Sequence, residues 1–299
     1  MRQSRSERWF GAINAALLFC LTLLFIYPLY FVLIASISEP YEVVKGNVFL
    51  YPKGITMTAY ANVFQESSVW TGYRNTIVYT ILGTTYNLLL TIPAAYVLTK
   101  KYLPGRKILA TYFLITMYFS GGMIPTYLNM KNLGMINSPM AMILGAGVSC
   151  WNLLVTRQFF EGNIPDALYE AASIDGSSEF YTFVRIALPL SMPIIAVMTL
   201  FYAVGHWNSY YNALLYLRTS KLFPLQLVLR NILISNEMAL TNATLSGDTE
   251  AIAVAARRAY MAEAMKYALI FISAAPLLIA YPFVQKYFVK GVMIGAIKG

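Results

Sequence analysis

The sequence predicts an all-α, polytopic membrane protein with six transmembrane helices. Of its 299 residues, 58% are hydrophobic and only 12% are charged, whereas soluble domains carry about 25% charged residues. The hydrophobic residues also gather in six runs, and about 20 mostly apolar residues suffice to cross a bilayer as a helix. A chain this apolar cannot hide its surface in one water-soluble core, so we expect most of it to lie in a membrane.

The six candidate spans follow one another along the whole chain. They are residues 11–37, 75–99, 107–128, 138–160, 183–207 and 265–288. The first one resembles a signal peptide, but its apolar run exceeds the roughly 7–15 residues of such peptides, and we interpret it as a retained helix. The fourth and fifth are the least continuous, because polar residues intrude at both of their ends.

Prolines interrupt most of these spans. They are Pro93, Pro125, Pro189, Pro193, Pro276 and Pro282. A proline frees a backbone carbonyl, which neighbouring protein or water must satisfy, and broken helices are common around translocation paths. Prolines are also simply more frequent in membrane helices, so both interpretations stay open.

Basic residues indicate how the spans are oriented. They cluster at the N-terminus, after the second span and near the C-terminus: Arg2, Arg5, Arg8, Lys100, Lys101, Arg106, Lys107, Lys286, Lys290 and Lys298. Six spans place both termini on one side, and the positive-inside rule makes that side the cytoplasm. The net charge of +9 then reflects topology, and we expect no nucleic-acid partner.

Two long connections are predicted to face outward. Residues 38–74 have balanced charge, and residues 208–264 mix polar and apolar positions, for which we expect short helices. Both connections are large enough to contact something outside the membrane.

The cytoplasmic connection 161–182 departs from the positive-inside trend, because it is acidic. It carries Glu161, Asp166, Glu170, Asp175 and Glu179. We expect Asn163 to cap a helix that ends at Gly176, and Ser177 or Ser178 to begin a second helix.

One face of the first of these two helices suits a partner protein. Leu168, Ala171 and Ala172 share that face at spacings of three and four residues. Small alanines let another surface approach closely, and Glu170 places a negative charge beside them. The pattern predicts a docking element for a separate protein.

This segment also carries a known motif. Glu170-Ala171-Ala172, Gly176 and Ile186-Ala187-Leu188-Pro189 resemble the cytoplasmic signature of membrane subunits of bacterial importers driven by ATP-binding cassettes (ABC importers): E-A-A, three residues, G, nine residues, I-x-L-P. The whole chain is similar to the carbohydrate-uptake branch, the maltose-type second permease. It is closer still to the lipoprotein-linked oligosaccharide and aldouronate permeases of Gram-positive bacteria, through Gly205–Leu217 and Tyr281–Gly299.

The resemblance implies a type I ABC importer permease fold. It implies one transmembrane domain over residues 1–299, with a cytoplasmic coupling loop at 163–189 and a cytoplasmic tail at 289–299. The residues implied to belong to the coupling loop are Glu170, Ala171, Ala172, Gly176, Ile186, Leu188 and Pro189. In the family, that loop sits in a cleft of the ATPase and transmits its closure to the membrane helices.

The resemblance also implies a division of labour between subunits. Two permeases form the path as a heterodimer, two copies of a cytoplasmic subunit hydrolyse ATP with Mg, and an extracellular lipoprotein delivers the carbohydrate. The chain itself has no G-x-x-x-x-G-K-[ST] phosphate loop. We therefore expect no cofactor and no enzyme activity in this chain, but half of the path of an oligosaccharide importer in a bacterial plasma membrane, with both termini cytoplasmic.

A polar and aromatic cluster at the outer end of the fifth span is the candidate sugar contact. It comprises Trp207, Asn208, Tyr210, Tyr211 and Asn212. Sugars are held by apolar faces and a few placed polar groups. There are two alternatives to a sugar contact: the cluster can be part of an aromatic belt at the membrane interface, or a structural segment that fixes the loop.

Other polar residues at membrane depth have a simpler interpretation. Tyr86, Asn87 and Asn152 can line the path, but we favour hydrogen bonding between helices. His206 is the only histidine, and it lacks the neighbours that a metal site requires. We expect no metal and no catalytic residue.

Three rival functions follow from the same composition. A secondary transporter would be expected to carry charged residues inside its spans, where this chain has almost none. A membrane enzyme needs a catalytic constellation, and we find none. A permease for a non-sugar solute is disfavoured only through the family resemblance.

Overall fold

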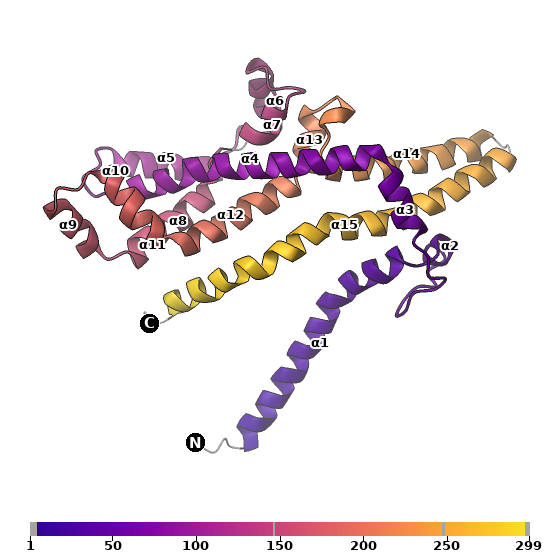
Figure 1. Ribbon diagram of the computed structural model, residues 1–299, viewed down its shortest axis with the longest axis horizontal. Coiled ribbons are helices and arrows are strands. Elements are labelled where there is room, and N and C mark those ends of the chain that lie inside the picture. Colours follow the sequence, from indigo (N-terminus) through magenta and orange to yellow (C-terminus); the bar gives the residue numbers. More distant parts are fainter. Residues whose placement is uncertain (1–4, 146, 247–248, 297–299) are drawn as a thin grey trace. The chain divides into compact units, whose positions relative to one another are not determined.

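The computed structural model describes residues 5–145, 147–246 and 249–296. This part of the chain is mostly helical and contains no strand (Figure 1). Arg2 and Lys298, used above for orientation, and the end of the tail at 297–299 lie outside the described residues. The chain forms two compact units, Met1–Val69 with Leu229–Ala275, and Trp70–Val228 with Pro276–Gly299.

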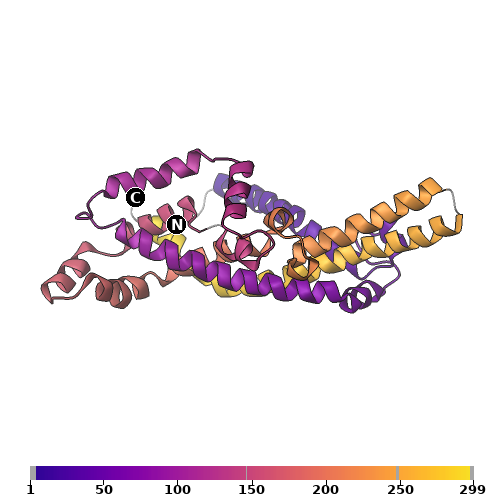
Figure 2. The same cartoon turned by 90° about the horizontal axis from the view of Figure 1, so that it is seen from above.

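The first unit contains the N-terminal helices and a helical hairpin. Its elements are α1 (Arg5–Ser36), α2 (Pro40–Val44) and α3 (Thr58–Gln65), together with most of α14 (Leu225–Ser246) and the first part of α15 (Thr249–Ala296). Within this unit α14 and α15 run side by side, as both ribbon views show (Figures 1 and 2).

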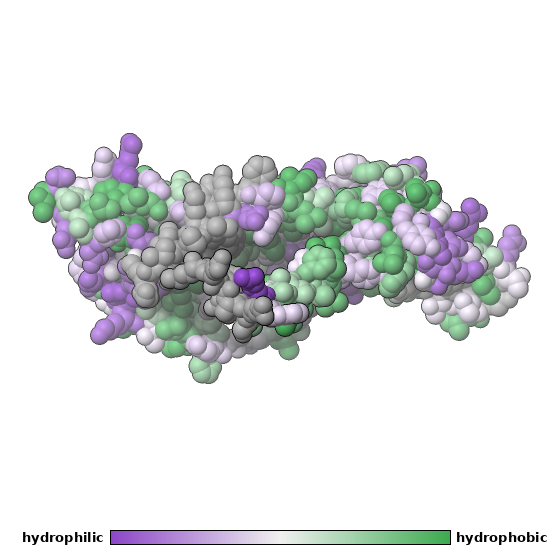
Figure 3. All heavy atoms as spheres, turned by 90° about the horizontal axis from the view of Figure 1, so that it is seen from below, coloured by the Kyte–Doolittle hydropathy of each residue, from purple (hydrophilic) through white to green (hydrophobic). Residues whose placement is uncertain are grey.

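The end of α1 is fixed by a small apolar core in the first unit. Ile34 and Ala35 pack with Val43 and Val48, and the ring of Phe31 meets that of Tyr267 edge-on at 5.7 Å. The rest of α1 exposes its apolar side chains, among them Trp9, Phe10 and Phe25. Figure 3 likewise shows hydrophobic side chains (green) on much of the face it draws. Such exposure suits a helix solvated by lipid.

The second unit holds the remaining helices. They are α4 (Ser67–Val97), α5 (Arg106–Tyr118), α6 (Met123–Asn132), α7 (Pro139–Leu144), α8 (Cys150–Asn163), α9 (Asp166–Ile174), α10 (Glu179–Thr182), the π-helical turn η1 (Phe183–Ala187), α11 (Leu188–Leu190), α12 (Met192–Trp207), α13 (Tyr210–Tyr216) and the 3₁₀ turn η2 (Ser220–Leu222). The helix α4 starts three residues before this unit does.

Close packing ties α4 to the start of α14 within the second unit. The backbone N–H of Leu225 donates to the Thr76 hydroxyl at 2.8 Å. A Cβ added at Gly72 would lie 3.1 Å from the Leu225 Cα. A side chain at position 72 would therefore push these two segments apart, which explains a glycine at this contact.

Among the described residues, three helices are long and apolar enough to cross a membrane: α1, α4 and α15. Two further spans are possible as bent pairs, with α5 and α6 at 115°, and Glu179–Leu190 and α12 at 79°. The first bend follows from Gly122, whose φ of 87° favours glycine. The predicted fourth span, 138–160, is instead divided between α7 and α8, both short. The count of six therefore stays a prediction.

The expected short helices of 208–264 are present at its start, but they do not account for most of this connection. Only α13 and η2 are short there, whereas α14 has 22 residues and α15 begins at Thr249. The two long helices run side by side (Figures 1 and 2), and tertiary pairing of this kind extends helices beyond what local sequence predicts.

Candidate functional site: a coupling loop and a polar cavity

Two short helices, α9 and α10, form the predicted coupling loop in the second unit. Gly176 between them has a φ of 73°, and the Ser178 hydroxyl accepts from the Tyr181 N–H at 3.2 Å. These two features confirm the predicted glycine hinge and serine start. The predicted Asn163 cap is wrong, because Asn163 ends α8 and Pro165 precedes α9. The Asn163 amide instead donates to the Phe159 carbonyl at 3.2 Å.

The acidic character of the loop has a structural explanation in three ion pairs. Glu161 contacts Arg106 at 2.7 Å, Asp166 contacts Lys101 at 3.2 Å, and Glu179 contacts Lys100 at 3.1 Å. All three cations come from the basic segment that follows α4. The acidic loop therefore complements the positive cluster next to it.

Lys100 is the least exposed of these three cations, although its partner Glu179 is 59% exposed. The Lys100 side chain is 12% exposed, and its Nζ lies 4.4 Å from the ring centre of Tyr96 and 4.1 Å from that of Tyr169. Burial raises the pKa of Tyr169 to about 12, and the carboxylates of Asp166 and Glu179 add to this shift. The Tyr169 phenol stays neutral at physiological pH, and its ring presents an attractive face to the ammonium.

The outer face of the loop is exposed and partly apolar. Glu170 and Ala171 are exposed, whereas Ala172 is buried inside the unit. Within the described chain Glu170 makes no ion pair. Ile174 and Phe180 are 86% and 77% exposed, and such apolar side chains in an otherwise polar segment are typical of a protein contact. Neither residue belongs to the spaced motif, although two apolar residues flanking Gly176 in a polar segment are a usable signal.

The base of the loop is built into the core of the second unit. Ala187 belongs to a buried cluster with Phe160 and Ile92, and Leu188 packs against that cluster. Ile186 lies in η1, and Pro189 lies exposed in α11 just before the bend into α12. A displacement of the loop is therefore transmitted to packed helices, because close-packed interiors do not absorb it.

A polar cavity of about 350 Å³ lies in the same unit, between α4, the segment 147–152 and the ends of α12 and α13. The Asn87 side chain donates to the Gly147 carbonyl at 2.5 Å and bonds the His206 Nε2 at 2.7 Å. The Tyr202 hydroxyl bonds Thr91 at 2.7 Å and accepts from the Ser149 N–H at 3.2 Å. Asn87 of α4 therefore forms a hydrogen bond to His206 of α12, as the favoured interpretation of bonding between helices predicts.

The predicted sugar-contact residues have different surroundings in the structure. Trp207 is buried and meets the ring of Tyr73 edge-on at 5.9 Å, which matches the structural alternative. Asn208 donates to the Val204 carbonyl at 3.1 Å. The exposed Tyr211 donates to the Met123 sulfur at 2.9 Å.

Tyr210 is exposed beside Tyr211, with the two rings 6.4 Å apart. Of the five predicted residues, only Asn212 lines the polar cavity, where it joins Asn152, Ser209 and His206.

The chain is similar to known proteins over most of its length. Residues 67–294 match the family described as the binding-protein-dependent transport system inner membrane component. Protein LplC of Bacillus subtilis is 39% identical over 299 residues, which cover 100% of this chain and 98% of that protein. The polygalacturonan/rhamnogalacturonan transport system permease protein YtcP of the same species is 36% identical over 293 residues, 98% of this chain and 99% of that protein.

A solved structure has the same fold. It is that of a bacterial ABC transporter involved in the import of the acidic polysaccharide alginate. One of its chains matches with a TM-score of 0.83 and 34% identity, over 96% of this chain and 99% of that chain.

Proposed function

Because the chain belongs to the family of binding-protein-dependent transport system inner membrane components, we propose that it is one permease subunit of an ATP-driven importer for a carbohydrate, most simply an oligosaccharide. The names of YtcP and of the alginate transporter support a saccharide cargo. The chain has an ABC importer permease fold. It forms half of the path, and a second, different permease forms the other half.

The coupling loop carries this proposal. Its base is fixed in the core, its paired acids hold α9 and α10 against the basic segment after α4, and its outer face leaves Glu170 and Ala171 exposed beside Ile174 and Phe180. Such a surface suits the cleft of a cytoplasmic ATPase. Gly176 sets the angle between the two helices, and Ile186, Leu188 and Pro189 connect the loop to α12.

The mechanism that follows is alternating access. Two copies of the ATPase subunit bind ATP and Mg and close together, and the loops in their clefts follow. The helices bent at Gly122 and before α12 then open the path outward, where a lipoprotein delivers the sugar. Hydrolysis returns the path to its inward state. ATP drives the cycle only because it binds the two states with different affinities. Both chain termini lie in the cytoplasm of a bacterial cell.

Affinity purification from native membranes tests this function. A tagged chain in mild detergent should bring a second permease and an ATPase, identified by mass spectrometry. In a cysteine-free background, a cysteine at Ala171 should crosslink to the ATPase. The matched control is a cysteine at Lys107, which is predicted to face the same side but lies outside the loop. A chain that purifies alone and gives no crosslink at Ala171 would contradict the proposal.

A further inference from the structure

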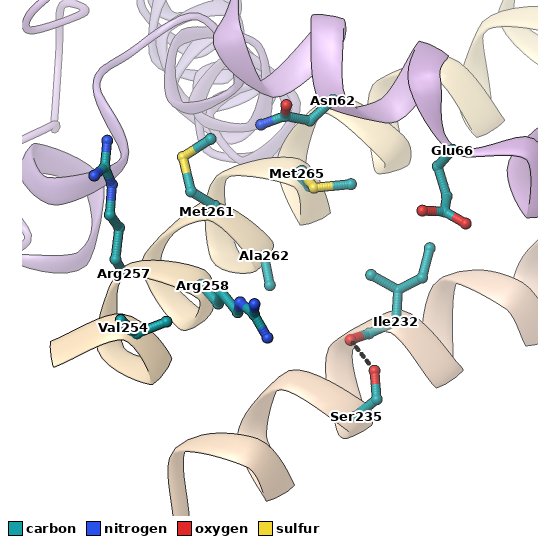
Figure 4. A pocket seen from close by; sticks show the side chains of 10 residues that line it. All are labelled: Asn62, Glu66, Ile232, Ser235, Val254, Arg257, Arg258, Met261, Ala262 and Met265. Carbon is teal, nitrogen blue, oxygen red and sulfur yellow. Dashed lines mark hydrogen bonds between the residues drawn. The ribbon is translucent and has the colours of Figure 1, made fainter. Parts of the chain in front are cut away.

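A second pocket lies in the first unit, between α3, α14 and α15 (Figure 4). Its volume of about 640 Å³ falls within the roughly 300–1,000 Å³ of small-molecule sites. Its residues come from the two connections, 38–74 and 208–264, that the sequence places outside the membrane, and from the adjoining start of the sixth predicted span. We define it as the arginine pocket by Asn62, Glu66, Arg257, Arg258, Met261 and Met265.

The two arginines of the pocket are exposed. No ion pair involves Arg257 or Arg258 in the part of the chain that the structure describes. The nearby Glu263 is paired instead with Lys266 at 2.9 Å. Figure 4 shows Arg258 extending from α15 toward Ser235 of α14. A guanidinium offers a planar fork of donors that matches a carboxylate, so a pair of exposed arginines suits this rim to an anion.

The opposite side of the pocket has different chemistry. Glu66 reaches in from the end of α3 (Figure 4), and its carboxylate accepts a hydrogen bond from the Ser68 hydroxyl at 2.9 Å. The half-buried side chains of Met261 and Met265 and the buried Ala262 lie between the charged groups. The pocket therefore combines a cationic rim, an apolar surface and a carboxylate that can accept hydrogen bonds from hydroxyl groups.

We propose that the arginine pocket binds a uronate unit of an acidic oligosaccharide on its way to the membrane path. A uronate carries one carboxylate for Arg258, hydroxyl groups for Glu66 and Asn62, and an apolar C–H face for the methionines. A segment of acidic peptide fits less well, because Glu66 repels a second carboxylate. The inference rests on the proposed function, since the sugar is the cargo of that importer.

Binding to the complete importer in lipid nanodiscs tests the proposal. The probes are uronate trisaccharides (galacturonate, mannuronate, guluronate and a xylan-derived aldouronate) and the methyl ester of each, which keeps the shape and removes the charge. The variant is Arg258→Gln. Its matched control is Arg230→Gln, because Arg230 also lies in the first unit on α14 but does not line the pocket. We expect at least one acid probe to bind wild type, and to bind Arg258→Gln about tenfold more weakly.

The proposal also requires selectivity for charge. The methyl ester should bind wild type and Arg258→Gln alike, and Arg230→Gln should behave as wild type with the acid. Three results would overturn the proposal. Either no acid probe binds to wild type, or acid and ester lose affinity equally in Arg258→Gln. The third is that Arg258→Gln loses attachment of the lipoprotein while its affinity for the acid probes stays unchanged. Failure of the proposed function looks different, because the importer then takes up neither acids nor neutral sugars in any variant.

Discussion

The Lys100 ammonium lies 3.1 Å from the Glu179 carboxylate and faces the rings of Tyr96 and Tyr169. Tyr96 belongs to the buried core of the second unit, Tyr169 to α9 and Glu179 to α10. One cation therefore joins both helices of the coupling loop to the end of α4. These contacts predict that the loop moves with α4 as one body, and several variants can test this prediction.

Lys100→Gln should loosen the loop, whereas Lys101→Gln should not. The Lys101 side chain is 83% exposed, and its pair with Asp166 is the kind that contributes at most about 1 kcal/mol. Lys100 adds contacts with two rings, each worth about 0.5–1 kcal/mol. We expect Lys100→Gln to lower the free energy of unfolding by about 1–2 kcal/mol, and to reduce sugar-stimulated ATPase activity. Thermal unfolding of the purified importer measures the first effect, and equal stability of the two variants would contradict it.

Glu170→Lys should uncouple transport without preventing membrane insertion. Glu170 is exposed on α9, so the change removes no internal contact and acts only on a bound partner. The control is Lys107→Glu, a charge reversal at an exposed residue of α5. We expect uptake to fall at least about tenfold in Glu170→Lys at unchanged expression, because like charges at an interface cost several kcal/mol. Wild-type uptake in this variant would disprove the docking role of α9.

Ile174→Ser should weaken attachment of the ATPase. The side chain is 86% exposed in the free chain, and burying a side chain of this size is worth about 1.5–3 kcal/mol. Ile55→Ser is the control, because Ile55 is 73% exposed in the other unit. Recovery of the ATPase in pull-downs should drop about tenfold or more for Ile174→Ser alone. Equal recovery with both variants would mean that the apolar tip of α9 is not part of the interface.

Composition and local motifs predicted the parts of the fold that depend on local physics. The helical class and the long apolar helices α1 and α4 follow from runs of hydrophobic residues. The hinge at Gly176 and the start at Ser178 follow from backbone preference and capping. Glu170 and Ala171 were assigned to the loop by a spaced motif, and the structure leaves both exposed.

What sequence reasoning missed depends on contacts between distant residues. The division of 138–160 into α7 and α8 and the long pairing of α14 with α15 are tertiary outcomes. The same holds for Trp207, whose ring is buried against Tyr73, more than a hundred residues earlier. A tryptophan that packs in a core and one that contacts sugar have the same local sequence, so only the fold separates them.

Gly83→Ala should destabilise the second unit, because a Cβ at this position would overlap the His206 ring. His206 bonds Asn87, which in turn bonds the Gly147 carbonyl. Forcing the ring away costs about 1–3 kcal/mol for overpacking, and it also disturbs these bonds. Gly162→Ala is the control, because its Cβ would meet nothing within 4 Å and alanine favours a helix by about 1 kcal/mol. A Gly83→Ala protein that melts no lower than wild type would contradict the packing of α4 on α12.

Trp207→Ala and Asn212→Ala should separate stability from transport. Trp207 is 6% exposed, and truncating a buried tryptophan costs about 3–5 kcal/mol, so we expect a lower melting temperature and less assembled importer.

Asn212 is exposed and lines the polar cavity, and its truncation should leave the free energy of unfolding within about 0.5 kcal/mol of wild type. If the cavity belongs to the path, Asn212→Ala raises the KM for sugar at normal assembly, because a placed polar contact is lost. Unchanged uptake kinetics in Asn212→Ala would exclude Asn212 from the path. Normal assembly of Trp207→Ala would instead reopen a direct contact between its indole and the sugar.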